Sequence, residues 1–371
     1  PDFGATVGAA GVTGRKDVSW VDRRDFGQHI AGLVLGIAGA AGLDTGRLFA
    51  LLPQAQPTGT RHIGIADVEI VEEVTAAFRA QDFSHGSGPI RDAAMAQLRT
   101  VLPLLDAELA PDMQPRLQLA VAELAALAGW MSFDVLDHEG ARRLWMIGLD
   151  LARETEHPLG TDLSALLMGN MVLQALHLQR PDEAAHLVRI GRSAAVGRHP
   201  VSASTASLFD NIAARAHAAQ GDSAGCERAL GQAVEQFTSI DVTTAPRWTA
   251  YIAHTRVSGH PGVAYYTLAL DGQNRRATDR AVFSLREAVT GFGSSYTKLG
   301  ALYLPNLAGA HALAGDTDTA VTLGHEAADA AAAVSSPMVR DGLRVLHTAL
   351  EPMRTSPGVA ELRDRLATTA A

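Results

Sequence analysis

The sequence predicts an all-α fold, a tetratricopeptide-like α-solenoid in which helix–turn–helix repeats stack into a right-handed superhelix. Alanine is abundant and runs of β-branched or aromatic residues with a period of two are missing, which favours helices over strands. One pattern also recurs: a turn-like residue, an acidic or polar stretch, and a small residue followed by apolar or small residues four and seven positions on. Such internal repetition is typical of a helical repeat array.

The small residue of this pattern marks the second helix of each repeat. The markers are Ala141, Ala184, Cys226, Ala281 and Ala320. Their intervals are 43, 42, 55 and 39 residues, longer than the minimal tetratricopeptide repeat of about 34, so we expect lengthened helices or added turns. The longest interval contains Pro246 and a Gly-His-Pro-Gly run at 259–262, which should break one helix into pieces.

Composition and charge limit the function. With 371 residues, 47% of them hydrophobic and 19% charged, the chain is long and apolar enough to bury a large core. The formal net charge is −9 and the arginines are dispersed among acids, so we expect no nucleic-acid binding by this chain itself. Its one cysteine, Cys226, cannot form an intrachain disulfide, which suits a cytoplasmic protein.

The N-terminal part is predicted to contain two segments before the repeats. Residues 1–20 are glycine-rich, with no preceding strand and no following Gly-Lys-Ser/Thr, so we interpret them as a flexible linker and not a phosphate loop. Residues 21–57 are interpreted as an apolar junction helix ended by Pro53 and Pro57. The chain begins at a proline without an initiator methionine, and we expect a further segment upstream.

The junction segment has an alternative interpretation. Arg23 and Arg24 precede an apolar run at 30–42, which resembles a twin-arginine export signal and would make this an exported repeat protein. The run is shorter than the ~20 residues that span a bilayer and lacks a clean cleavage site. We therefore favour a buried or interdomain helix, and we expect no membrane association.

Residues 58–371 are predicted to form the repeat array with C-terminal capping helices. Val71, Val74 and Phe78 keep the spacing of one helical face and predict the first of these helices. The expected elements are a helix over 65–81, a loop over 84–89, a helix over 90–108, repeats from about 114, and two charged capping helices over 338–351 and 358–367.

No pattern in the chain predicts catalysis. The Gly-Ser-Gly sequence after His85 lacks the spacing and the strand–helix context of a nucleophile elbow. His325 and Asp329 lie one helical turn apart, as in a metalloprotease helix, but no third ligand is evident. We therefore expect no catalytic residue, no metal site and no cofactor, and we interpret the protein as non-enzymatic.

The first helix of each repeat is expected to line a concave groove. Counting back from the markers places these helices at about 122–135, 165–178, 207–220 and 301–314. Three asparagines fall at nearly one position of three of them: Asn170, Asn211 and Asn306. An amide offers a donor and an acceptor together, which suits a peptide backbone. The alternative is that these amides satisfy a neighbouring helix.

Four further residues complete the set of groove candidates. Gln174 follows Asn170 by four positions and His177 follows Gln174 by three, so all three share one helical face. Arg215 follows Asn211 by one turn. Trp130 is a candidate for an apolar groove wall, although an aromatic residue in such a repeat is also a common core residue.

Several stretches carry a resemblance to a known family. They are 23–26, 124–134, 142–145, 149–153, 174–178, 180–184, 199–203 and 308–316. Together they resemble the actinobacterial tetratricopeptide-containing transcriptional regulators of the Cro/repressor helix-turn-helix type, over nearly the whole chain from about residue 21. In that family a DNA-binding domain commonly precedes the region seen here, and no such domain is present in this sequence.

The resemblance implies a function. It implies the ligand-sensing and oligomerisation region of a transcriptional regulator that binds a peptide, protein or small-molecule effector in the concave groove. DNA would be bound only through an upstream domain, and we expect a homodimer. Resemblance to peptide-sensing regulators also implies that groove asparagines contact the ligand backbone. The alternative is a constitutive tetratricopeptide protein–protein adaptor without DNA-binding output.

Overall fold

The computed structural model describes residues 64–370, apart from 108, 111, 195–198, 256–257 and 271–273. The described residues belong to one compact unit that spans residues 60–371. The linker and the junction helix expected at 1–57 lie outside the described residues. Within these residues all regular structure is helical and no strand occurs, which confirms the all-α prediction.

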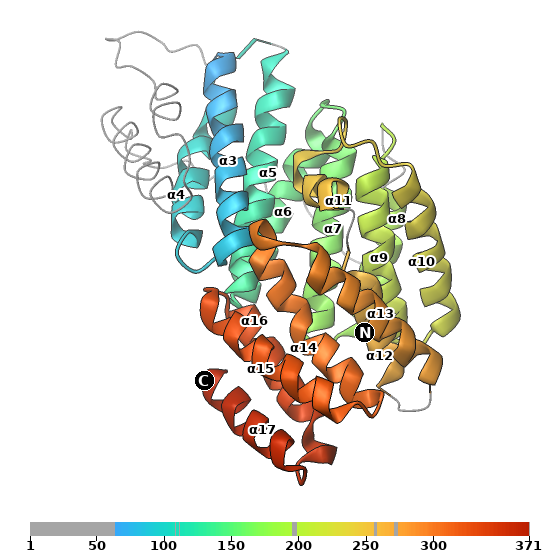
Figure 1. Ribbon diagram of the computed structural model, residues 1–371. Helices are drawn as coiled ribbons and strands as arrows, with labels where there is room; N and C mark the ends of the chain where they lie inside the picture. Colours follow the sequence, from blue (N-terminus) through green and yellow to red (C-terminus); the bar gives the residue numbers. More distant parts are fainter. Residues whose placement is uncertain are drawn as a thin grey trace, which may run out of the picture. The chain divides into compact units, whose positions relative to one another are not determined.

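Most of the helices pack in pairs that follow one another along the chain (Figure 1). Two helices, α3 (Ile65–His85) and α4 (Arg91–Val101), precede them and pack on α5. The pairs are α5 (Met113–Asp134) with α6 (His138–Glu154), α7 (Gly160–His177) with α8 (Pro181–Ala194), α9 (Ala203–Ala219) with α10 (Ser223–Thr238), α12 (His260–Ala269) with α13 (Arg275–Gly291), α14 (Thr297–Leu313) with α15 (Thr317–Ala333), and α16 (Pro337–Ala349) with α17 (Pro357–Thr369).

The five marker residues all lie at helix–helix contacts. Each stands on the second helix of its pair, and each is 0% exposed. Small side chains at such positions let two helices approach closely. The same holds for Gly129 on α5, where an added Cβ would come within 2.4 Å of the Trp145 ring on α6. The markers therefore identify the contact between the two helices in five of the six pairs.

One turn geometry joins the helices of four pairs. Its central residue has a positive φ, and the next backbone N–H donates to the carbonyl five residues earlier at 2.8–3.0 Å. The positive-φ residues are Leu136, Gln179, Gly221 and Gly315. In three of these turns an aspartate follows and its side chain accepts a hydrogen bond from the backbone of the next helix. The recurrence in sequence thus corresponds to a recurrence in backbone conformation.

The chain between α10 and α12 is broken into short pieces, as predicted. A 3₁₀ turn, η2 (Arg247–Thr249), and a short helix, α11 (Ala250–Thr255), precede α12. Elsewhere an expectation about length was wrong: the helix predicted over 90–108 ends at Val101 and continues as the 3₁₀ helix η1 (Leu102–Asp106). Pro103 has no backbone N–H, so it cannot continue the α-helical hydrogen bonding.

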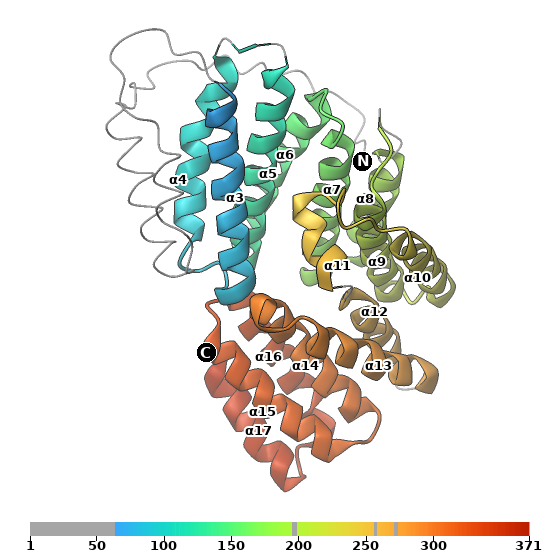
Figure 2. The same ribbon diagram turned by 45° about the horizontal axis from the view of Figure 1, so that its top comes forward.

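The last helices return to the first ones (Figure 2). α14 packs against α3, and α16 packs against α5. The backbone N–H of Ser335 donates to the carbonyl of His85 at 2.8 Å, and that of Gly88 donates to the Ser335 carbonyl at 3.1 Å. Two short 3₁₀ turns, η3 (Ser294–Tyr296) and η4 (Glu351–Met353), precede α14 and α17. Elements far apart in sequence therefore enclose a common space.

Candidate functional site

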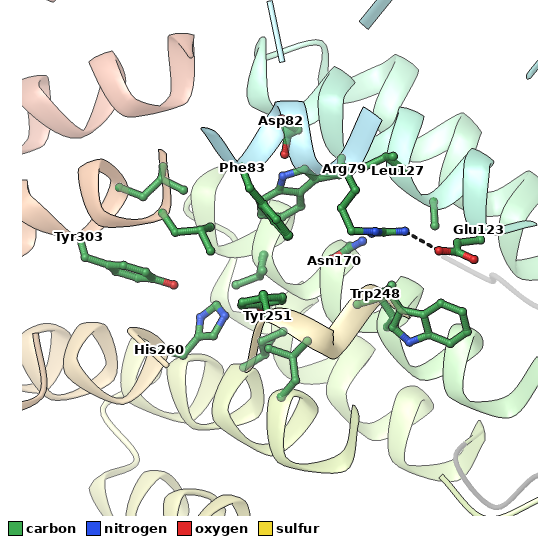
Figure 3. Close-up of a pocket in the computed structure, with 18 residues that line it drawn as sticks. Arg79, Asp82, Phe83, Glu123, Leu127, Asn170, Trp248, Tyr251, His260 and Tyr303 are labelled. Atoms are coloured by element: carbon green, nitrogen blue, oxygen red, sulfur yellow. Dashed lines mark hydrogen bonds and ion pairs between the residues drawn. The ribbon is translucent and has the colours of Figure 1, made fainter. Parts of the chain in front are cut away.

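A cavity lies among the first helices of the pairs (Figure 3). Its wall is formed by α3, α5, α7, α9, α12 and α14, together with the η2–α11 segment. The empty space measures about 750 Å³, including the solvent at its opening. Small-molecule sites are commonly apolar hollows with a few placed polar groups, and the residues that line this cavity are of that kind.

Aromatic side chains form much of the wall. Phe83 on α3 and Tyr251 on α11 meet with ring centroids 5.2 Å apart, although they are far apart in sequence. Trp130, Trp248 and Tyr303 line the same space. The indole Nε1 atoms of both tryptophans are buried and have no hydrogen-bond partner among the described residues. The wall therefore offers flat apolar surface, while these two N–H groups are buried behind it.

Where Arg79 and Glu123 line the cavity, the positive and negative side chains are paired with one another. Arg79 donates from Nη2 to Glu123 Oε1 at 2.7 Å, and Arg247 donates to the other oxygen of Glu123 at 3.0 Å. Arg247 also lies 3.3 Å from Glu72, which accepts hydrogen bonds from Arg116. Burial alone would raise the pKa of Glu72, but Arg116 and Arg247 together hold it below its ordinary value.

A buried ionic cluster lies beside this wall. Lys298 Nζ is 2.6 Å from Asp82 Oδ1 and 3.4 Å from Asp134 Oδ1, and all three side chains are fully buried. Burial and the neighbouring charge of Asp134 raise the pKa of Asp82. Burial would lower the pKa of Lys298, but the two carboxylates outweigh it and raise that pKa. Ser336, the residue that caps the start of α16, donates a hydrogen bond to Asp134 at 2.8 Å.

A different arrangement occurs at His260. The guanidinium Nη1 of Arg215 lies 3.2 Å from His260 Nδ1. Because arginine is only a donor, Nδ1 must accept and the imidazole hydrogen must sit on Nε2. Burial, with a contribution from Arg215, lowers the pKa of His260 to about 3. His260 is therefore a neutral donor at physiological pH, and it lines the cavity.

Among the predicted site residues, Trp130 and Asn170 line the cavity. Asn170 is 7% exposed, and its amide makes no hydrogen bond with a described residue. Asn211 is similarly buried and similarly without a bond, on the helix that carries Arg215. Arg215 reaches the cavity wall through His260. Trp130 and Asn170 therefore lie at the cavity and Arg215 contacts its wall, whereas Asn211 is not among the residues that line it.

The other three predicted residues are not brought to the cavity. Gln174 uses its whole amide between helices, since Nε2 donates to the His138 carbonyl and Oε1 accepts from Arg142, both at 2.7 Å. His177 packs edge-on against Phe133, with its Nε2 3.8 Å from an Asp341 carboxylate oxygen. Asn306 donates to the Leu302 carbonyl of its own helix at 3.2 Å. A ligand role for these residues remains a prediction.

Sequence reasoning missed most of the cavity wall. Phe83, Trp248, Tyr251, His260 and Tyr303 were not singled out. The broken stretch after Pro246 could have indicated Trp248 and Tyr251, because a short aromatic segment between two helix pairs has to pack against other helices. The sequence did not show that this segment packs against α3.

The histidine and aspartate that the sequence placed one helical turn apart have a structural role in the described chain. His325 and Asp329 both contact Arg365 of α17, so they join α15 to the last helix. In the part of the chain that the structure describes, no cluster of histidine, cysteine and acidic side chains has the geometry to hold a metal ion. No helix described there has the length and apolar character needed to cross a membrane.

Comparisons with protein-family models, with curated proteins and with solved structures found no match to this chain.

Proposed function

We propose that this chain is the ligand-sensing and oligomerisation region of a transcriptional regulator, built as a tetratricopeptide-like right-handed superhelix. Support for the repeat class comes from the identical turns in four helix pairs and from the buried marker residues. In such arrays each repeat contacts its neighbours and the first helices form the binding surface. DNA would be bound by an upstream domain, and we place the protein in the cytoplasm as a homodimer.

The observation that carries the binding proposal is the cavity itself. It is lined by successive first helices, and it contains Asn170, which is buried and has no hydrogen-bond partner among the described residues. An amide without a partner among the described residues can donate to and accept from a bound ligand, and these hydrogen bonds would add to the affinity. Because side chains from six helices and the η2–α11 segment surround the space, it favours a small molecule, or one side chain of a peptide, over a long extended peptide.

The position of the cavity supports a sensing role. Its wall joins α3 and α5 to α12 and α14, which are distant in sequence. A ligand that contacts both sets would favour the arrangement in which they are close, and so would shift the equilibrium between two arrangements of the repeats. The junction segment 21–57 precedes α3 and would transmit this shift to an upstream domain.

A ligand screen tests this proposal. The 371-residue protein is incubated with a panel of metabolites and short peptides, and its melting temperature and tryptophan fluorescence are measured. A ligand that binds the native state raises the melting temperature by mass action. Because Trp130 and Trp248 line the cavity, the same ligand should also change the fluorescence. If only a protein partner produced an effect, the protein would instead be an adaptor.

Two matched variants locate the binding. Leu302→Trp places a large ring in the cavity wall, whereas Leu313→Trp adds the same ring at an exposed position of the same helix. We expect the first to abolish the ligand effects and the second to retain them. Equal binding by both variants would contradict the cavity as the site. The regulatory part is tested by reading the coding region upstream, where the absence of a DNA-binding domain would contradict it.

A further inference from the structure

Arg215 is a partly buried cation without a carboxylate partner. The other cations near the cavity are paired: Arg79 with Glu123, and Lys298 with two aspartates. Among the described residues no carboxylate lies within 4.0 Å of the Arg215 guanidinium, whose described hydrogen-bond partner is His260. A cation removed from water without a counter-ion is unfavourable. The site therefore lacks one negative charge.

His260 connects this cation to the cavity. Its Nδ1 accepts from Arg215, so its Nε2–H remains as a donor, and no described residue accepts from it. The side chain is 8% exposed and lines the cavity. A hydrogen bond from Arg215 polarises the imidazole and strengthens the donor on its far side. An anionic oxygen at Nε2–H would gain from both groups.

Tyr303 supplies a second donor beside His260. Its hydroxyl makes no hydrogen bond with a described residue, and Figure 3 shows it directed toward the cavity near His260. Burial raises the pKa of Tyr303, so the hydroxyl keeps its proton. Its ring is held by stacking on Phe292, with centroids 5.9 Å apart. Two fixed donors thus face the same part of the cavity.

The aromatic part of the wall would contact the end of a ligand that lies away from these donors. Phe83 and Tyr251 meet at a tilted ring contact, and Trp248 lies on the same short segment as Tyr251. Planar aromatic groups pack well against such rings through offset and edge contacts. An apolar ring among these side chains would leave its polar head for the donors at His260 and Tyr303.

We propose that the cavity binds an aromatic carboxylate. Its carboxylate accepts hydrogen bonds from His260 Nε2–H and the Tyr303 hydroxyl, Arg215 supplies the compensating charge through His260, and the ring lies among Phe83, Trp248 and Tyr251. This inference rests on the proposed ligand-binding function of the cavity and adds the chemical class of the ligand.

Pairs of acids and their neutral amides test the charge. The probes are benzoate and benzamide, 2-naphthoate and 2-naphthamide, and indole-3-acetate and indole-3-acetamide, with Kd measured by isothermal titration at pH 7.5. Each pair has nearly the same shape and differs in charge. Because charge-assisted hydrogen bonds are stronger than neutral ones, the best acid should bind at least about tenfold more tightly than its amide.

Variants assign the preference to the Arg215–His260 relay. Arg215→Gln should reduce the acid-to-amide ratio to within about twofold, and Arg215→Lys should retain part of it, because the charge remains. His260→Phe keeps an aromatic ring but removes the donor, and should also lose the preference. Arg228→Gln removes an exposed arginine from α10 and should leave the ratio unchanged. Circular dichroism identifies folded variants, so the His260 variant decides the outcome if Arg215→Gln fails to fold.

Two results would overturn the inference in different ways. If an amide bound as tightly as its acid to the unaltered protein, the anionic ligand class would be wrong while the cavity remained a binding site. If no probe bound and the Leu302→Trp variant behaved as the unaltered protein throughout the broader screen, the proposed function would fail as well. Equal loss of acid and amide binding in Arg215→Gln would show that Arg215 only supports the cavity wall.

Discussion

Lys298 on α14 lies 2.6 Å from Asp82 on α3, and both side chains are fully buried. Asp134 on α5 is the second carboxylate of the lysine, at 3.4 Å. The cluster therefore ties the beginning of the described chain to a helix more than two hundred residues later. Because it adjoins the cavity wall through Asp82, the same contact that connects these helices also shapes the candidate site.

Replacing Lys298 should strongly destabilise the protein. Lys298→Met leaves two buried carboxylates without their cation, which we expect to lower the free energy of unfolding by about 3–5 kcal/mol. Urea unfolding followed by circular dichroism measures the change. The triple variant with Asp82→Asn and Asp134→Asn removes the unpaired charges and should recover a large part of the loss. A loss below about 1 kcal/mol in the single variant would show that the cluster contributes little.

Two glycines should respond oppositely to the same substitution. Gly221 has a φ of +72° in the turn between α9 and α10, so Gly221→Ala should cost about 1 kcal/mol although no atom lies near the added Cβ. Gly231 lies exposed within α10, and there Gly231→Ala should stabilise by about 0.5–1 kcal/mol. Thermal unfolding of both variants measures the difference. Effects of equal sign would contradict the assigned turn.

The stability of the protein should fall in mild acid, partly because of His260. Its pKa is about 3 in the folded protein and near 6.5 in an unfolded chain. Between these values the unfolded chain binds the proton and the folded protein does not, so this contribution is present above about pH 6.5 and is lost as the pH falls toward 3. Between pH 7 and pH 5 the loss is about 2 kcal/mol from this residue.

Comparing His260→Gln with the unaltered protein isolates the contribution of His260 to the pH dependence of the unfolding free energy. Urea unfolding at pH 7 and pH 5 gives the change in unfolding free energy for each, and the variant should show the smaller change. An identical pH dependence would indicate that His260 is protonated in the folded protein. In that case Arg215 could not donate to Nδ1.

The two buried asparagines should affect binding more than stability. Neither Asn170 nor Asn211 makes a hydrogen bond with a described residue, so Asn170→Ala with Asn211→Ala removes no described partner. We expect the melting temperature to stay nearly unchanged while the Kd for the best ligand of the screen rises at least about fivefold, since each of the two amides removed would contribute a hydrogen bond of roughly 0.5–1.5 kcal/mol. A large drop in melting temperature would show that both amides are structural.

Short-range sequence patterns predicted much of the helical architecture. Ala184 and the other markers predicted where helices are in contact, because only a small side chain fits between two closely packed helices. In the structure Asp222 and Asp316 stand at helix starts, where their carboxylates accept from the first backbone N–H groups. The same reasoning predicted the break after Pro246. Each of these features depends on residues a few positions apart.

The candidate site depended on information of another kind. Asn170 and Asn306 occupy nearly the same place in their repeats, yet one lines the cavity and the other bonds to its own helix. Register along a helix determines which residues share a face, but the rotation of that helix against its neighbours determines what the face meets. Gln174 illustrates this, since Arg142 and the His138 carbonyl take up its amide.

By itself the sequence determined that the described chain is helical, where the turns between most paired helices fall, and which small residues join them. These properties follow from short-range spacing, capping and turn conformation. Only the tertiary structure decided that α3, α11 and α14 enclose a cavity and that Arg215 stands beside His260 without a described carboxylate. Contacts between residues so far apart in the chain are set by how the helices pack, which no local pattern encodes.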